Sequence, residues 1–370
     1  MIRLTTPELG KEEIKEVGKV LRSGFLTQGE NVEKFELKIA EYLNVKYAIA
    51  VSSGTAALHL SLIALEIKKG DEVILPDFTF PATGNVIALV GAKPVLVDID
   101  LKTYNIDPAK IEESITPRAK AIIPVHLFGQ SAEMDPILEI ARRYNLDVIE
   151  DAACALGAEY KGKKCGTLGD IGCFSFHPRK AITTGEGGMV MTNDPGIAAK
   201  VNALRNHGMI NKDGKYYFEY AGFNYRMTDF QGAMGWIQME KLEEIIEKRR
   251  ELAALYDSLL KNNDNLRIPF VANGNKHIYQ SYVVLLDEQI NRDSVIRKLR
   301  GKEIETTIGT YALHRQPFYQ KNYDYKEGEL KNSYKVFKQS LCLPIYTQMK
   351  QKDIRKVTEN LLSECVTIKV

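Results

Sequence analysis

The chain has 370 residues, a formal net charge of +2 and a charged-residue content of 26%. This length is too great for one small core and suits two domains, one of them large. The near-neutral charge, without long runs of like charge, excludes a basic face for nucleic acid or a membrane surface. No apolar stretch reaches the roughly 20 residues that a membrane-spanning helix needs.

The first segment, MIRLTTPELGKEEIKEV, lacks the apolar core of a signal peptide. The five cysteines form no CxxC pair, and their odd number argues against a disulfide framework. We therefore expect reduced thiols and a cytoplasmic protein.

Short apolar runs alternate with helical stretches from about residue 46 to residue 192. The predicted strands are 47–51, 72–76, 93–99, 119–128, 146–152, 171–177 and 188–192. Between several of them, apolar residues recur three and four positions apart, which indicates helices with one buried face. Continuous apolar strands separated by helices predict the α/β class, with a mostly parallel seven-stranded sheet flanked by helices.

The pattern changes after Asp229, where residues 229–262 predict one long helix or two in series. A strand over 277–287 and helices over 291–302 and 351–365 follow. We expect a large domain over residues 1–248 and a smaller α+β domain over residues 249–370. The first 25 residues are expected to pack with the smaller domain.

Polar residues follow several predicted strands, and ligands bind at the carboxyl ends of the strands in such sheets. Lys180 is the most informative of them, because it lies between a strand and a glycine-rich turn in IGCFSFHPRKAITTGEGGMV. A lysine amine held in this way can form a Schiff base with an aldehyde cofactor and can then act as a proton shuttle. The alternative is an ordinary surface lysine.

The segment Ser52–Thr55 follows strand 47–51 and opens the next helix. Backbone N–H groups and the helix dipole make such a position a phosphate site, and Gly54 lets the backbone come close. The same segment could instead be an ordinary helix cap.

The predicted strand 146–152 carries two adjacent carboxylates, Glu150 and Asp151. Pyridoxal phosphate is an electron sink only while its ring nitrogen stays protonated, and a carboxylate partner keeps it so. Neighbouring strand residues point to opposite faces, so only one of the two can reach a cofactor. An amine, a carboxylate and an anion-binding helix start are together what pyridoxal phosphate chemistry requires.

The order and wording of these segments resemble fold-type I pyridoxal phosphate enzymes, in particular the nucleotide-sugar (DegT/DnrJ/EryC1/StrS-like) aminotransferases. The motifs that carry the resemblance are SSGTAAL, EVILPDFTFPAT, PVHLFGQ, EDAA, SFHPRKAITTGEGGMV, GFNYRMTD and HRQPFY. The resemblance implies pyridoxal 5′-phosphate as cofactor and a homodimer with a composite active site. It also implies transfer of an amino group from L-glutamate to a 3- or 4-keto group of a nucleotide-linked deoxysugar.

Individual roles follow from the same resemblance. Lys180 and Asp151 are the implied catalytic pair. The implied cofactor contacts are Ser53, Gly54, Thr55, Phe80, Asp151, Cys154, Ser175, Lys180 and Asn224. The implied substrate contacts are His126, Tyr225, Arg226 and His314. Neither histidine has partners at metal-ligand spacing, so no metal site is expected.

Three of these positions leave questions open. Phe80 is expected to stack on the cofactor ring, although it or Phe78 could be plain core. Asn224 matches an asparagine that relatives reach across the dimer interface, although it could cap a helix. Relatives often have Gln or His at the position of Cys154, and a thiol is a poorer hydrogen-bond donor.

Other functions are compatible with the fold. A sugar dehydratase of the same branch has a histidine in place of the lysine, so Lys180 argues against it. Aminotransferases that act on non-nucleotide cyclic ketones belong to the same branch, and sequence alone distinguishes them poorly from the nucleotide-sugar enzymes. Outside enzymes, a cofactor- or sugar-sensing regulator is the alternative, but a DNA-binding one would need a helix-turn-helix or a basic face.

Overall fold

The computed structural model describes residues 1–326 and 328–365. Its centre is a seven-stranded sheet in the order β1-β10-β9-β6-β5-β2-β4. The strands are β1 (Tyr47–Val51), β2 (Glu72–Pro76), β4 (Lys93–Val97), β5 (Ala119–Ile122), β6 (Asp147–Asp151), β9 (Ile171–Ser175) and β10 (Gly188–Thr192). β10 runs antiparallel to both its neighbours and the other pairings are parallel, which confirms the expected class.

Helices cover both faces of this sheet because its strands are apolar on both faces. In β10, Val190 packs into the core under one layer, whereas Met189 and Met191 pack under the other. The first layer consists of α3 (Gly54–Ala64), α4 (Pro81–Leu89) and α7 (Pro195–Arg205). The second consists of α2 (Glu30–Leu43), α5 (Pro108–Glu113), α6 (Met134–Tyr144) and part of α8 (Asp229–Leu260).

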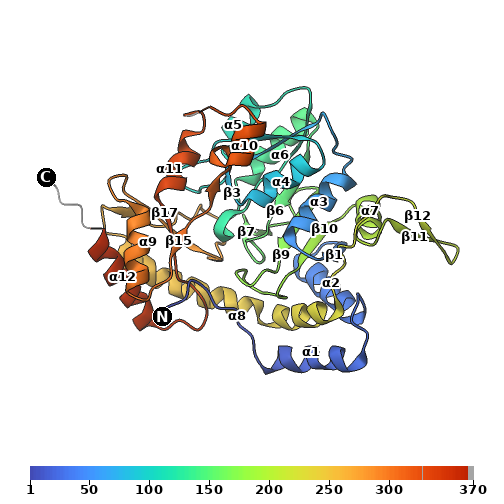
Figure 1. Cartoon of the computed structure of the whole chain (residues 1–370), viewed down its shortest axis with the longest axis horizontal. Coiled ribbons are helices and arrows are strands. Elements are labelled where there is room, and N and C mark those ends of the chain that lie inside the picture. Colours follow the sequence, from blue (N-terminus) through green and yellow to red (C-terminus); the bar gives the residue numbers. More distant parts are fainter. Residues whose placement is uncertain (327, 366–370) are drawn as a thin grey trace.

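The long helix α8 joins the two parts of the molecule and runs along the lower side of Figure 1. It is one unbroken helix, so the sequence alternative of two in series does not hold. Its C-terminal end, from Leu252 to Leu260, packs in a second core with strands and helices of the C-terminal third. Those elements are β13 (Leu266–Arg267), β14 (Tyr282–Leu286), α9 (Arg292–Gly301), β17 (Ser340–Leu343) and α12 (Gln351–Glu364), and β15 (Thr307–Ile308) pairs with β17. Residues 366–370 of the expected small domain lie outside the described residues.

The N-terminal residues contact both parts. Ile2 forms a bridge with Ile304, and the main-chain oxygen of Leu4 accepts a hydrogen bond from the N–H of Ile345. Helix α1 (Lys11–Ser23) instead lies beneath the N-terminal half of α8, as Figure 1 shows. The first few residues therefore pack with the C-terminal third, while α1 packs on the helix that supports the large sheet.

Smaller elements complete the chain. β3 (Phe78–Thr79) pairs with β16 (Tyr311–Ala312), which brings the C-terminal third against the large sheet. The hairpin of β11 (Met209–Lys212) and β12 (Lys215–Phe218) projects from the body at the right of Figure 1. The others are β7 (Glu159–Tyr160), β8 (Lys163–Lys164), α10 (Pro317–Asn322), α11 (Lys331–Gln339) and the 3-10 turns Leu127–Gly129 and Leu313–Arg315.

Candidate active site

The carboxyl ends of three sheet strands lie in one row. Val51 at the end of β1 is opposite Gly188 of β10, which is opposite Ser175 at the end of β9. On the next strand, Asp151 at the end of β6 pairs with Cys173, two residues before Ser175. The polar segments that follow these strands therefore meet at one edge of the sheet, as the sequence predicts for a ligand site.

The turn from β1 into α3 brings a helix N-terminus beside Ser175 of β9. Ser53 caps the helix, and its Oγ accepts a hydrogen bond from the N–H of Ala56 at 3.1 Å. A Cβ added to Gly54 would lie 2.8 Å from the Cβ of Ser175, so only a glycine lets the first turn of α3 rest against β9. The helix N-terminus and the Ser175 hydroxyl are thus adjacent, and both favour an anion.

Asp151 is held firmly at the end of β6. Its N–H donates to the oxygen of Pro124 at 2.9 Å, and its own main-chain oxygen accepts from the N–H of His126 at 3.0 Å. The carboxylate accepts a hydrogen bond from Thr83 Oγ1 at 2.7 Å and another from the N–H of Ala153 at 3.2 Å. The side chain is buried, so these bonds fix its orientation.

Glu150 points to the opposite face and is fully buried. Its carboxylate accepts hydrogen bonds from the N–H groups of Gly166, Leu168 and Gly169 at 2.6–2.8 Å. It also accepts one from His126 Nε2 at 2.7 Å. Glu150 is therefore engaged by the loop that precedes β9, which leaves Asp151 as the carboxylate of this pair for the ring-nitrogen role.

His126 is also completely buried. Its Nδ1 accepts a hydrogen bond from the N–H of Ala132 at 3.0 Å, so the proton is on Nε2, which donates to Glu150. Both ring nitrogens are engaged inside the protein. This placement favours a structural role over the substrate contact that the sequence suggested.

Lys180 lies on the loop after β9 with a half-buried side chain. Its Nζ donates to Cys154 Sγ at 3.1 Å, which links this loop to the end of β6. Two glutamines hold the loop on either side of the lysine. Gln280 Nε2 donates to the oxygen of Arg179 at 2.7 Å, and Gln238 Oε1 accepts from the N–H of Thr183 at 3.3 Å.

The two phenylalanines that the sequence could not separate have opposite environments. Phe78 is fully buried in the core, whereas Phe80 is 63% exposed at the start of α4. The edge of the Phe80 ring meets Tyr311 at a centroid distance of 6.4 Å. Of the two, Phe80 has the free ring surface that stacking requires.

The segment that contains Asn224, Tyr225 and Arg226 runs beside the end of β1. The N–H of Ser52 donates to the oxygen of Tyr225 at 2.8 Å, and Val51 forms a bridge with Arg226. The N-cap of α8 is Thr228, so Asn224 does not cap this helix, and its side chain is exposed. An open cavity beside the segment is lined by Thr27, Gln28, Gly29, Glu33, Asn206, His207 and Arg226.

His314 is buried against Asp77 at the end of β2. Its N–H donates to Asp77 Oδ1 at 2.7 Å, and its Nδ1 lies 2.6 Å from Oδ2. Burial raises the pKa of the Asp77 carboxyl, while the bond to His314 opposes that rise. The two contacts fasten the 3-10 turn Leu313–Arg315 to the end of β2. They leave Nδ1 of the His314 ring engaged by Asp77.

Comparison with known proteins decides the family. Residues 7–362 match the model of the DegT/DnrJ/EryC1/StrS aminotransferase family. The chain belongs to this family. Its members are pyridoxal phosphate-dependent aminotransferases that act in sugar biosynthesis.

The similarity to individual aminotransferases extends over nearly the whole chain. The GDP-perosamine synthase of Caulobacter vibrioides is 45% identical over 89% of this chain and 88% of its own length. The structure of Helicobacter pylori PseC, an aminotransferase involved in the biosynthesis of pseudoaminic acid, superposes with a TM-score of 0.93 at 30% identity, covering 98% of each chain. Spr1654 of Streptococcus pneumoniae, solved in a PMP form, has a TM-score of 0.93 at 27% identity, covering 98% of this chain and 97% of its own.

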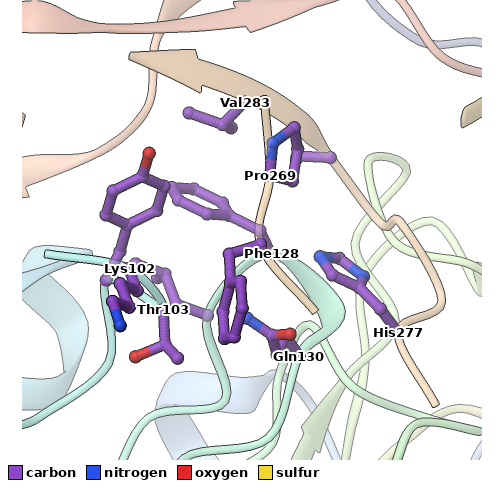
Figure 2. Close-up of a pocket in the computed structure, with 11 residues that line it drawn as sticks. Lys102, Thr103, Phe128, Gln130, Pro269, His277 and Val283 are labelled. Carbon is purple, nitrogen blue, oxygen red and sulfur yellow. The ribbon is translucent and has the colours of Figure 1, made fainter. Parts of the chain in front are cut away.

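A separate small cavity of this aminotransferase lies between its two parts. Figure 2 shows Lys102, Thr103 and Gln130 of the large domain facing Pro269 and Val283 of the C-terminal third across it. Its lining contains neither the lysine loop nor the end of β6. It is therefore distinct from the candidate site.

Two findings concern other kinds of site in this aminotransferase. Within residues 1–326 and 328–365, no three His, Cys, Asp or Glu side chains gather where they could hold a metal ion. Over the same ranges, the helices are too short or too polar to cross a membrane.

Sequence reasoning missed three residues that contact the site. Thr83 lies inside the motif EVILPDFTFPAT, and its hydroxyl donates a hydrogen bond to Asp151. Nothing in that motif indicates that this hydroxyl contacts a distant carboxylate. Gln238 and Gln280 hold the lysine loop from distant parts of the chain. No local pattern in the sequence points to either glutamine.

Proposed function

We propose that this aminotransferase moves an amino group from L-glutamate to a keto group of a nucleotide-linked sugar, a 3- or 4-keto-deoxysugar. The observation that carries the proposal is the Lys180 amine, held 3.1 Å from Sγ of Cys154, three residues after the buried carboxylate of Asp151. The names of GDP-perosamine synthase and of PseC, whose chains align over most of this one, support a sugar nucleotide as the acceptor.

The residues at the sheet edge fit pyridoxal 5′-phosphate as the cofactor. The cofactor phosphate would be held by Ser53, Thr55 and Ser175. These residues lie close together because Gly54, which has no side chain, lets the start of α3 approach β9. Phe80 would cover one ring face with its exposed ring. When bound, the cofactor supplies an aldehyde that carries the amino group and a ring that accepts electrons.

Two side chains of the protein supply the acid–base chemistry. Asp151, fixed by Thr83 and Ala153, would hold a proton on the ring nitrogen, because a carboxylate stabilises a neighbouring cation. With the cofactor bound, the Lys180 amine would hold its aldehyde, and the same amine would move a proton at the substrate carbon. The hydrogen-bond partner of the amine, Cys154, is a thiol and therefore a weak hydrogen-bond group.

We further propose a homodimer in which Asn224 contacts the cofactor phosphate of the partner subunit. Its side chain is exposed beside the end of β1 and does not cap α8. Mixing inactive Lys180→Ala subunits with inactive Asn224→Ala subunits would restore part of the activity if each hybrid dimer has one intact site. No recovery after verified subunit exchange would leave Asn224 as a ligand of its own chain.

The deciding experiment combines spectroscopy with product analysis. Purified protein with pyridoxal phosphate is followed by visible absorption before and after L-glutamate, and 2-oxoglutarate is measured. Conversion of the aldehyde form to the amine form establishes the donor. Chemically prepared GDP- and dTDP-linked keto sugars, with the free keto sugars as controls, then test the acceptor by mass spectrometry. Amination of the free sugar alone would refute the nucleotide-linked substrate, and an unchanged spectrum would refute L-glutamate as donor.

A further inference from the structure

We propose that Thr83 is a positioning residue for Asp151, and that its hydroxyl keeps this carboxylate aimed at the cofactor site. The proposal rests on the proposed function, because Asp151 acts there on the cofactor ring. Thr83 is 1% exposed on the first turn of α4, and its Oγ1 lies 2.7 Å from Asp151 Oδ2.

The direction of this hydrogen bond follows from the chemistry of its partners. An ionised carboxylate can only accept, so the single hydroxyl proton of Thr83 goes to Asp151. The oxygen of Phe80, at 3.3 Å, is a longer and weaker alternative acceptor. Thr79 Oγ1 lies 3.2 Å from Thr83 Oγ1 and is buried as well, so Thr79 is free to donate to Thr83. The result is a chain of two hydroxyl groups that ends on the carboxylate.

Hydrogen bonds donated to a carboxylate stabilise its charged form, and burial without such bonds favours the neutral acid. Asp151 is 5% exposed, and its carboxylate accepts hydrogen bonds from Thr83 Oγ1 and from the Ala153 N–H. Removing the hydroxyl would leave the longer of the two bonds. We therefore expect the orientation of the carboxylate toward the ring nitrogen to depend on Thr83.

The turn that carries Thr83 is itself held rigidly. A Cβ added to the next residue, Gly84, would lie 2.3 Å from the hydroxyl oxygen of Tyr319 and 3.0 Å from Leu313. The first turn of α4 is thus in direct contact with the C-terminal third of the chain. Phe80 begins the same turn, so one rigid element places both the exposed ring and the hydroxyl.

The test uses 4′-deoxypyridoxine 5′-phosphate, which has the ring nitrogen and phosphate of the cofactor but no aldehyde. Its binding is independent of Lys180, of L-glutamate and of any sugar, so it reports the ring and phosphate contacts alone. The dissociation constant is measured between pH 6 and pH 8.5 for wild type, Thr83→Val, Thr83→Ala and Thr83→Ser. Urea unfolding of each variant checks the fold.

We expect Thr83→Val and Thr83→Ala to bind the analogue about 10- to 100-fold more weakly, which is the range for a hydrogen bond to a charged group. Thr83→Ser, which keeps the hydroxyl, should bind within about threefold of wild type.

Wild-type affinity in both the Thr83→Val and Thr83→Ala variants would overturn the role of Thr83 and leave the proposed function intact. An equal loss in Thr83→Ser would overturn it too, because packing would then explain the effect. Wild-type protein that binds neither the analogue nor pyridoxal phosphate would overturn both proposals.

Discussion

The amine of Lys180 and the thiol of Cys154 lie 3.1 Å apart, across two loops that leave different strands of the sheet. Cys154 is half-buried, whereas Cys165, Cys173, Cys342 and Cys365 are buried. The cysteine beside the lysine is thus the accessible thiol of the five. Its reactivity can report whether the cofactor occupies the site.

We expect iodoacetamide to alkylate Cys154 first in the native protein, and pyridoxal phosphate to slow this reaction. The thiolate is the nucleophile, and burial raises the pKa of Cys342 to about 11 and that of Cys365 to about 12. Peptide mass spectrometry over a time course measures the rates. Cys154→Ser is the control and should remove the fast phase. Equal labelling rates with and without the cofactor would contradict the placement of Cys154 at the site.

Much of the fold could be predicted from the sequence because the central strands are continuous apolar runs. The predicted strands 47–51, 72–76 and 188–192 coincide with β1, β2 and β10. The predicted strand 119–128 was too long, since β5 ends at Ile122 and the chain then turns through Pro124. Proline has no N–H to continue the ladder, and this turn carries His126 into the interior.

The contacts that hold the site could not be predicted in the same way. Thr83 and Asp151 are 68 residues apart, and Gln280 and Arg179 are 101 apart. Such pairs depend on how distant elements pack, which periodicity does not encode. The choice between Glu150 and Asp151 was open from the residues for the same reason, because alternation shows that they diverge but not which face holds the lysine.

Glu150→Gln is expected to destabilise the protein without touching the cofactor. The carboxylate accepts three main-chain hydrogen bonds and one from His126 in a fully buried position. The amide of a glutamine would place its own N–H₂ donor against these N–H donors. We therefore expect the free energy of unfolding to fall by about 3 kcal/mol or more. Urea unfolding measures it. The control is Glu139→Gln, whose side chain is 66% exposed in an ion pair with Arg143. A loss no greater than that of the control would contradict the importance of the Glu150 network.

Gln280→Leu should loosen the loop that carries Lys180. The variant removes the hydrogen bond from the Gln280 amide to the oxygen of Arg179, the residue before the lysine. We expect faster hydrogen exchange over residues 177–187 and a fall of about 3- to 10-fold in kcat, the range for one neutral hydrogen bond, with little change in KM. The matched control is Gln289→Leu, because Gln289 is exposed in the loop that follows β14. Unchanged exchange in the lysine loop would show that Gln280 does not support it.

We expect His277 to make the stability of the protein depend on pH. It is 5% exposed, its Nδ1 accepts a hydrogen bond from the N–H of Tyr279 at 2.8 Å, and its ring stacks on that of Tyr279. Burial, assisted by the charge of Arg250, lowers the pKa of His277 from 6.5 to about 3. Between these two values the unfolded chain binds a proton that the folded chain does not, so the free energy of unfolding falls as the pH drops below 6.5.

At pH 5 the free energy of unfolding is expected to be lower by about 2 kcal/mol, because each pH unit below the pKa of the unfolded histidine costs about 1.36 kcal/mol. His277→Gln removes the titrating group, so its free energy of unfolding should fall less than that of wild type between pH 7.5 and pH 5. The variant should be less stable at pH 7.5, because it loses the stacked ring. Urea unfolding at both pH values tests this, with His207→Gln as the control at an exposed histidine. If wild type and His277→Gln lose equal stability over this interval, the buried imidazole does not titrate as its surroundings require.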